Sequence, residues 1–214
     1  MIIFLIGPPF SGKSSGKSSI GEFISKKYNI QYLRFKVLVD KYISENKRYS
    51  SLFLKNNYEN KPYPTRISFD VLKTYFNNKD DYILDNYPKN ITELKYLKAK
   101  YINKEKVFVI WVKTSKKVLL ERINLRLYCK KCNLTFNSND INQNQCSVCK
   151  NQLFHRKDDT IEIFLIRYNQ YLKNKNKLIK EFSEFADIIK IKNNTNNKED
   201  LFKEIDLKLL KYTF

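Results

Sequence analysis

The clearest chemical pattern in the chain is a loop of glycines and a lysine near the N-terminus. Gly7 is followed after four residues by Gly12, Lys13 and Ser14, and an apolar run at residues 2–6 precedes it. The spacing G-x-x-x-x-G-K-S between a strand pattern and a helix pattern is typical of a loop whose backbone N–H groups surround a phosphate. Lys13 would place a positive charge beside the β- and γ-phosphates, and Ser14 would offer a hydroxyl to Mg²⁺. The residues predicted to bind the nucleotide in this loop are Gly7, Pro8, Pro9, Ser11, Gly12, Lys13, Ser14 and Ser15.

A short repeat in this loop leaves two lysines as candidates. The tetrapeptide Ser-Gly-Lys-Ser occurs at residues 11–14 and again at 15–18. The distance to the first glycine favours Lys13, and Lys17 remains the alternative. Four residues are close to one turn of an α-helix, so we interpret the repeat as about one added helical turn. Phe10 also stands where such loops usually have a small residue.

Four cysteines form a second candidate site. Cys129 and Cys132 make one C-x-x-C pair, and Cys146 and Cys149 make another thirteen residues later. Each pair can hold one side of a metal ion, and two pairs complete a tetrahedral site. Thiolates fill all four positions, so the predicted site is structural and zinc is the expected metal. His155 is interpreted as a bystander, because four cysteines already complete the site.

Four arginines surround the cysteine segment. Arg122 and Arg126 lie four residues apart and so share one face of a predicted helix, while Arg156 and Arg167 follow the second cysteine pair. A guanidinium group binds two phosphate oxygens at fixed charge, which suits phosphoryl transfer. The alternative is a set of exposed ion pairs that contribute only ~0–1 kcal/mol each. Their position around one insert favours a role in phosphate binding.

Five apolar runs must position these residues. Predicted strands at residues 2–6, 30–33, 82–85, 107–112 and 188–191 alternate with predicted helices. This alternation predicts a P-loop NTPase-type, doubly wound α/β fold with a parallel five-stranded sheet. Ligands bind such sheets beyond the carboxyl ends of the strands.

Asp85 ends the third of these runs, so it is predicted to hold Mg²⁺ through the water shell of the ion; the alternative is a solvated carboxylate at a strand end. We also expect a helical region after the second strand, with Val37, Leu38 and Ile43 facing inward, and a following helix capped by Thr65.

Length and charge limit the possible classes of protein. A chain of 214 residues can hold one substantial core with inserted subdomains. The formal net charge of +19 would suit a nucleic-acid binder, but the lysines are dispersed, so we favour general compositional bias and nucleotides as ligands. No apolar run is long enough to span a membrane. A first strand that starts at the N-terminus and cysteines in a metal-binding pattern predict a cytoplasmic protein without a targeting peptide.

Considered together, these motifs resemble adenylate kinases of the long type, whose LID domain carries a zinc ribbon. The resemblance rests on Gly7-Pro-Pro-x-x-Gly-Lys13, Leu84-Asp85-Asn-Tyr-Pro88, Glu121-Arg122-Ile-x-x-Arg126, the cysteine pairs and Arg156-Lys-Asp-Asp159 leading to Arg167. It implies a CORE domain at residues 1–33, 69–121 and 159–214, a nucleoside monophosphate (NMP)-binding insert at 34–68, and a LID with a four-cysteine zinc site at 122–158. It also implies a monomer that converts Mg-ATP and AMP into two ADP.

The resemblance further implies roles for single residues. The residue matching Arg122 stacks on the ATP base, and those matching Lys13, Arg126, Arg156 and Arg167 grip the phosphates. The acceptor side departs from the family pattern, because Phe35, Lys36 and Asp40 replace the Thr, Gly and Arg of the acceptor loop. Lys89 replaces an arginine and loses its bidentate geometry, and Glu93 replaces the glutamine that reads adenine. Two alternatives therefore remain: a kinase with another monophosphate preference, and a pseudoenzyme that binds ATP without transfer.

Overall fold

A parallel five-stranded sheet organises the computed structural model of the chain, which describes residues 1–13, 19–46, 49, 63–77, 80–102, 106–132, 134–140, 144–194 and 197–212. In the order β2-β3-β1-β4-β7, the strands of this sheet are Gln31–Arg34, Tyr82–Asp85, Ile2–Ile6, Val107–Lys113 and Asp187–Lys192. Each neighbouring pair is parallel. The predicted doubly wound α/β class is confirmed.

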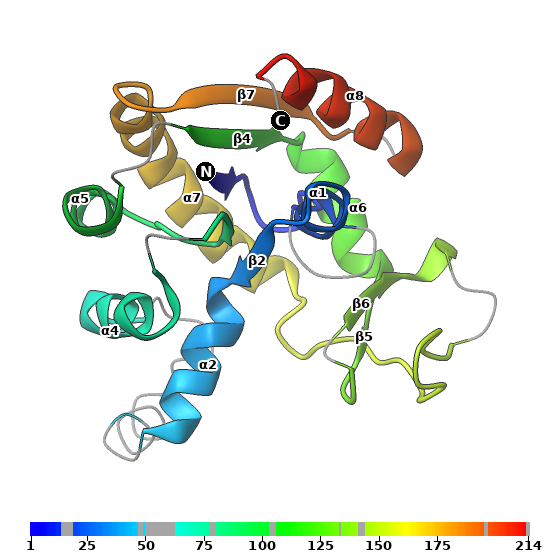
Figure 1. The fold of residues 1–214 in the computed structure, drawn as a ribbon. Helices are drawn as coiled ribbons and strands as arrows, with labels where there is room; N and C mark the ends of the chain where they lie inside the picture. Colours follow the sequence, from blue (N-terminus) through cyan, green and yellow to red (C-terminus); the bar gives the residue numbers. More distant parts are fainter. Residues whose placement is uncertain are drawn as a thin grey trace.

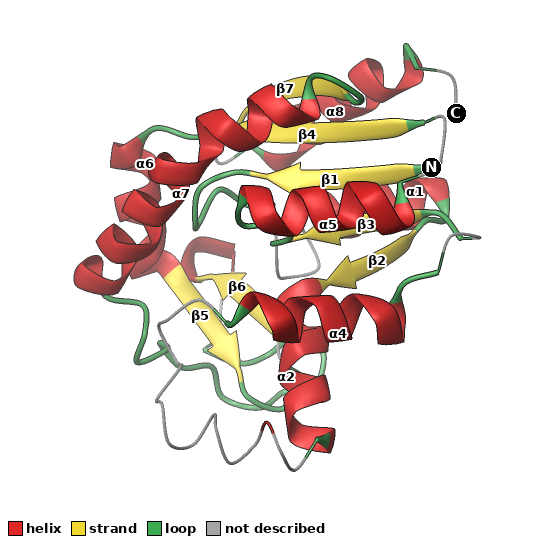
Figure 2. Cartoon of the chain, turned by 90° about the vertical axis from the view of Figure 1, so that its left-hand side faces the viewer, coloured by secondary structure: helices red, strands yellow, loops and turns green. Residues whose placement is uncertain are grey.

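Helices cover both faces of this sheet (Figures 1 and 2). The described helices are α1 (Ile20–Tyr28), α2 (Phe35–Glu45), α4 (Thr65–Tyr75), α5 (Ile91–Tyr101), α6 (Lys116–Leu125), α7 (Ile161–Phe182) and α8 (Lys198–Leu210). Among these helices none is both long and apolar enough to cross a membrane.

The core has one cluster on each side of the sheet. In β1, Ile2 and Phe4 join a cluster that includes residues of α2, α4, α5 and α7, whereas Ile3 and Leu5 join one that includes residues of α1 and α8. Successive strand residues point to opposite faces, so a strand that is apolar at every position is buried on both sides. The edge strand β7 instead alternates buried isoleucines with exposed lysines at its carboxyl end.

Local capping explains where several helices begin. Side chains of Ser19, Asn90, Ser115, Thr160 and Asn197 each accept a backbone N–H in the first turn of their helices. The predicted cap at Thr65 is wrong: Thr65 is the first residue of α4, and Pro64 precedes it without a side-chain hydrogen bond.

The inward face of α2 agrees with the prediction at Ile43, which is buried, and at Leu38, which packs against the core cluster, but not at Val37. Val37 is 48% exposed, whereas Phe35, Val39 and Ile43 are buried. Because α2 begins at Phe35, the helical period of 3.6 residues brings the residues four and eight positions later back to the same face. The prediction was therefore wrong at Val37 and missed Phe35 and Val39.

A second, smaller sheet lies apart from the main one (Figure 1). Strands β5 (Arg126–Cys129) and β6 (Leu134–Asn137) pair antiparallel and are followed by a short 3₁₀ helix, Ser138–Asp140. This ribbon joins α6 to the cysteine segment. It therefore connects the metal-binding candidates to the helix that carries Arg122.

Candidate functional site

The candidate site lies at the edge where the parallel strands end. The glycine loop follows β1, Arg34 ends β2, Asp85 ends β3 and Asn193 follows β7. Since all these strands run in the same direction, their carboxyl ends bring side chains that are far apart in sequence to one edge.

Close contacts leave no room for a side chain at either glycine of the loop. A Cβ atom on Gly7 would lie 2.9 Å from the carbonyl oxygen of Val112, and one on Gly12 would lie 2.7 Å from Nδ2 of Asn193. Gly12 also has φ +79°, a left-handed conformation that favours glycine. The glycine spacing seen in the sequence therefore has a steric reason in the fold.

Phe10 is the unusual residue of this loop. Its φ of 63° is left-handed, which is uncommon for a bulky side chain. Its ring packs against the cluster of Leu119, Ile123 and Phe164, with its centroid 6.0 Å from that of the Phe164 ring. Phe10 thus links the glycine loop to α6 and α7.

Lys13 meets a buried carboxylate at the end of β3. Lys13 is 9% exposed, and its Nζ lies 3.6 Å from Oδ1 of Asp85, which is 2% exposed. The Tyr32 hydroxyl donates a hydrogen bond to Asp85 Oδ2 at 3.3 Å. Burial and the neighbouring Asp85 carboxylate raise the pKa of Tyr32, so this hydroxyl stays protonated and can donate.

The predicted contacts of Ser14 and Ser15 fall outside the described residues, as do Lys17 and the proposed added helical turn. Helix α1 begins at Ile20, with Ser19 as its cap.

Arg122 is fixed against the loop by an asparagine that sequence analysis missed. Arg122 Nη2 donates to Asn193 Oδ1 at 3.0 Å, and Nη1 donates to the Phe10 carbonyl at 3.3 Å. Nδ2 of Asn193 donates to the Ser11 carbonyl at 2.8 Å. Asn193 is 4% exposed, so both ends of its amide are used in a buried setting. In the sequence it is the first of a run of asparagines, and only its place after the last strand could have marked it.

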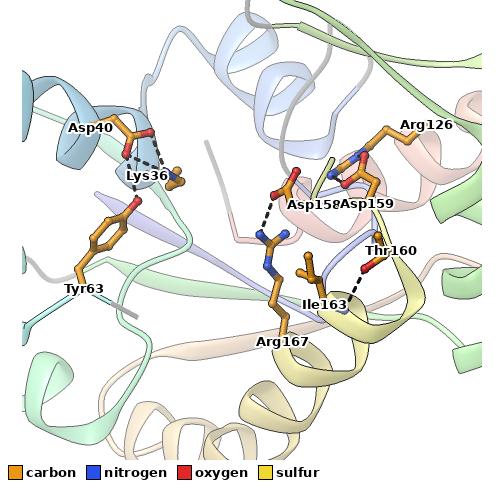
Figure 3. Close-up of polar contacts among 9 residues, drawn as sticks. All are labelled: Lys36, Asp40, Tyr63, Arg126, Asp158, Asp159, Thr160, Ile163 and Arg167. Carbon is orange, nitrogen blue, oxygen red and sulfur yellow. Dashed lines mark hydrogen bonds and ion pairs between the residues drawn. The ribbon is translucent and has the colours of Figure 1, made fainter. Parts of the chain in front are cut away.

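Two further arginines each pair with an aspartate (Figure 3). Nε of Arg126 donates to Oδ2 of Asp159 at 2.6 Å, and a second bond joins Nη2 to Oδ1 of the same carboxylate. Arg167 Nη2 donates to Asp158 Oδ2 at 2.7 Å, and this pairing helps to hold the pKa of Asp158 below its usual value although burial opposes it. Arg126 lies in β5 and Arg167 lies in α7, whereas both aspartates lie in the segment before α7.

Arg156 lies in a different setting. Its guanidinium carbon is 3.9 Å from the centroid of the Tyr128 ring, and among the described residues its buried Nε has no hydrogen-bond partner. Burial lowers the pKa of Arg156, and the nearby Arg126 lowers it further. Within the described part of this region, Nε of Arg156 is therefore a hydrogen-bond donor without an acceptor.

The four cysteines come together as predicted. Their Sγ atoms all lie within 4.8 Å of one another, with 3.5 Å between Cys129 and Cys149 and 4.0 Å between Cys132 and Cys146. Four thiolates around one tetrahedral ion at a Zn–S distance of about 2.3 Å would be about 3.8 Å apart. The cluster therefore fits a single metal ion. His155 is exposed and is not part of this group.

Comparisons with known proteins give the family. No family model matches the chain. The chain is similar to the adenylate kinase of Rickettsia africae, with 30% identity over 225 aligned residues that cover 99% of each protein. This chain belongs to the adenylate kinase family. The adenylate kinase of Rickettsia bellii is 28% identical over 93% of this chain and 94% of that protein. Family membership confirms the resemblance that the motifs indicated. The chain is therefore an ATP-dependent phosphotransferase of the nucleoside monophosphate kinase class.

In this adenylate kinase family member, two lysines of the predicted acceptor side lie near one aromatic ring. Lys36 Nζ is 5.3 Å and Lys89 Nζ is 4.8 Å from the centroid of the Tyr63 ring. Asp40 accepts a hydrogen bond from Lys36 at 2.7 Å and one from the Tyr63 hydroxyl at 3.0 Å (Figure 3). Burial lowers the pKa of Lys89, and repulsion from Lys36 and Lys13 acts in the same direction. A phosphate dianion would relieve that repulsion.

Glu93 contacts the segment that carries Lys89. It is 2% exposed, and its Oε2 accepts the backbone N–H of Lys89 at 2.7 Å. Burial raises the pKa of this carboxyl group above its usual value. Glu93 therefore also orders the segment that carries Lys89, a function that the sequence pattern did not indicate.

We expect the substitution Asn193→Ala to weaken Mg-ATP binding about tenfold. The change removes the amide that joins Arg122 to the loop and leaves the Ser11 carbonyl without this donor, a loss of about 1–3 kcal/mol for a buried polar group. Isothermal titration of the protein with Mg-ATP measures the effect. Asn194→Ala is the matched control, since Asn194 accepts the Ser115 backbone N–H and not a bond from Arg122 or the loop. Unchanged affinity in Asn193→Ala would contradict the assignment.

Proposed function

We propose that the chain transfers the γ-phosphate of Mg-ATP to AMP and releases two ADP. One observation carries the proposal: at the carboxyl edge of the sheet the Lys13–Asp85 pair lies in and beside a glycine loop, Arg122 donates to the Phe10 carbonyl of that loop, and the guanidinium carbon of Arg126 lies 4.2 Å from the Phe10 ring centroid, in a chain that matches adenylate kinases over its full length. Phosphoryl transfer depends on positioning and charge stabilisation, and it needs no nucleophilic side chain.

On the donor side, the loop from Gly7 to Lys13 is proposed to hold the phosphates of ATP. Lys13 places its ammonium group at the β- and γ-phosphates, and the Asp85 carboxylate beside it orients the water shell of Mg²⁺. Mg²⁺, when bound, neutralises charge on the phosphates. Arg122, fixed by Asn193, is proposed to lie on the ATP base.

The other arginines are proposed to stabilise the transferring group. Asp159 and Asp158 each hold one of these arginines, Arg126 and Arg167, which reduces the cost of ordering them when substrate binds. Arg156 contributes the donor that has no hydrogen-bond partner among the described residues. Guanidinium groups suit this role because they bind two oxygens each and do not lose their charge.

The acceptor phosphate is proposed to lie between Lys36 and Lys89. These two ammonium groups and the Tyr63 ring take the place of the family's arginines, and Asp40 keeps Lys36 in position. Lysine binds phosphate as a point charge, so this side has less geometric specificity than an arginine fork. Glu93 and Lys89 are the reason to test other monophosphates alongside AMP.

The division into parts is proposed as first predicted: CORE at residues 1–33, 69–121 and 159–214, NMP-binding insert at 34–68, and LID at 122–158. We propose that the four cysteines hold a structural zinc ion and that the LID closes over the reacting phosphates to exclude water. Action as a monomer stays a prediction.

The test is chromatographic detection of nucleoside diphosphates. The protein is mixed with Mg-ATP and, separately, with AMP, GMP, CMP or UMP, and the Lys13→Ala variant purified in the same way measures background. We expect ADP from ATP and AMP at a rate far above that background. If a diphosphate forms only with GMP, CMP or UMP, that monophosphate is the acceptor and AMP is not. ATP binding without product from any acceptor would contradict the proposal and favour a pseudoenzyme.

A further inference from the structure

Phe10 holds a backbone conformation that a bulky residue rarely adopts. Its φ is 63°, whereas glycine would adopt this φ without strain. A strained residue of this kind persists only where the surrounding contacts determine its conformation, and such residues cluster at active sites and ligand clamps. The contacts of the Phe10 side chain therefore indicate what its conformation is kept for.

The Phe10 ring contacts both an apolar cluster and a guanidinium group. It packs against Leu119, Ile123 and Phe164, and the guanidinium carbon of Arg126 lies 4.2 Å from its centroid. An aliphatic side chain could fill the apolar site equally well. A ring adds a face that attracts a cation, and the attraction is strongest where water is excluded. The Arg126 side chain is only 19% exposed, so this contact is largely shielded from water.

Asp159 holds the same guanidinium group by one of its edges. Nε and Nη2 of Arg126 both donate to the Asp159 carboxylate, whose side chain is 1% exposed (Figure 3). A guanidinium group has five N–H donors in one plane, so three others remain on Nη1 and Nη2. A phenyl ring has no oxygen or nitrogen acceptor. Phe10 therefore restrains Arg126 without satisfying those three donors, which can bind phosphate oxygens as a fork.

The same residue joins two arginines to the phosphate-binding loop. Phe10 lies between Gly7 and Gly12 in the sequence, and its backbone carbonyl accepts a hydrogen bond from Nη1 of Arg122 at 3.3 Å. Its backbone thus contacts Arg122, and its side chain contacts Arg126. These contacts place both guanidinium groups beside the loop before any nucleotide is bound.

We infer that Phe10 is a positioning residue for phosphoryl transfer: its ring and the Asp159 carboxylate together orient Arg126 toward the transferring phosphoryl group. The inference rests on the proposed function for its ligand. Phe10 acts through Arg126 and on no reacting atom. A guanidinium group that is already oriented stabilises the transition state without being ordered at the moment of reaction. A small residue at this position would leave Arg126 held by Asp159 alone.

The first test measures kcat and KM for ADP formation from Mg-ATP and AMP. Phe10→Leu keeps an apolar side chain but removes the ring face. A shielded cation–π contact contributes a factor of about 5 to 30, so we expect kcat to fall about tenfold. KM for Mg-ATP should stay within about twofold, because the lost interaction acts in the transition state. Phe10→Tyr keeps a ring and should recover most of the rate. Wild-type kcat in Phe10→Leu would overturn the inference.

Phe23→Leu is the matched control. Phe23 also has a cation near its ring, with Lys27 Nζ 6.0 Å from the centroid, but it stacks on Phe202 of α8 and has no contact with the loop arginines among the described residues. We expect wild-type kcat in this variant. A tenfold loss in Phe23→Leu as well would overturn the inference, because loss of any such ring would then slow the reaction.

A double-mutant cycle separates positioning from packing. Arg126→Gln removes the charge but keeps an amide that can donate to Asp159. If Phe10 acts through Arg126, Phe10→Leu should change kcat by less than about twofold in the Arg126→Gln background. An equal loss in both backgrounds would overturn the inference, since Phe10 would then act by packing alone. Melting curves verify folding, and Phe10→Met, which is flexible and apolar, replaces Phe10→Leu if that variant unfolds.

Failure of the proposed function gives a different result. A wild type that makes no diphosphate with any acceptor would overturn the proposed function and the inference together, because Arg126 would then have no transferring group to hold. An active wild type with a fully active Phe10→Leu variant would overturn the inference alone.

Discussion

Replacing Lys13 with alanine is expected to lower kcat/KM for ADP formation by about three orders of magnitude. A preorganised charge that stabilises the transferring phosphoryl group is commonly worth about 10²–10³ in kcat, and charged groups in phosphoryl transfer can contribute more. Lys13 is nearly buried, and its ammonium group lies beside Asp85, so neither solvent nor a mobile side chain can easily replace it. Initial rates with saturating Mg-ATP and varied AMP measure the loss.

The control for this experiment separates catalysis from stability. Removing Lys13 leaves the buried Asp85 carboxylate next to fewer positive charges, which destabilises the fold. Lys13→Arg keeps the charge, so it should recover the melting temperature but not the rate, since the guanidinium has a different shape. Lys17→Ala tests the other lysine of the repeat. A large loss of rate in Lys17→Ala with a near-normal Lys13→Ala would contradict the assignment of Lys13.

Replacing Cys146 with serine is expected to remove the metal and to unfold the cysteine segment. The apolar cluster there contains only Leu127 and Leu153 besides buried cysteines among the described residues, with Phe136 packed against it. So small a cluster is not expected to order the segment by itself, and we expect a bound metal to supply most of its folding free energy. Because Arg126 and Arg156 flank the segment, we expect kcat to fall by at least about tenfold, in line with the loss of one positioned phosphate-binding group. The measurements are zinc content, the melting curve and ADP formation.

His155→Ala is the matched control, since His155 is exposed and lies outside the cysteine group. That variant should retain one zinc ion per chain and the wild-type melting temperature. A fully active Cys146→Ser protein without zinc would contradict a structural metal in the LID. Full activity after exhaustive chelation of the wild type would contradict it equally.

The sequence was sufficient for the parts of the fold that depend on local pattern. Strands β1, β3 and β4 are apolar at nearly every position, so their place in a buried parallel sheet could be predicted from residue type alone. The cysteine pairs were equally clear, because their ligand type and spacing define the site. In both cases the physical cause is contained within a few consecutive residues.

The remaining features depend on where helices begin and on contacts between distant segments. In α2, Val37 was wrongly predicted to face inward because the first residue of the helix, Phe35, could not be located from the pattern. The contact of Asn193 with Ser11 joins residues 182 positions apart, and no local pattern marks such a pair. The hydrogen bond from the Ile20 N–H to the Gly12 carbonyl likewise cannot be predicted from a local pattern.

The pairing of Arg126 and Arg167 with aspartates has a consequence for how this enzyme treats ordinary anions. Each guanidinium already holds a carboxylate at hydrogen-bond distance, so an incoming anion must displace or share that partner. Chloride or inorganic phosphate, which brings a single charged group and few other contacts, gains little from such an exchange. A nucleotide brings several phosphates and a base, and its other contacts can offset the loss. We therefore expect Asp158 and Asp159 to weaken the binding of bulk anions to Arg167 and Arg126.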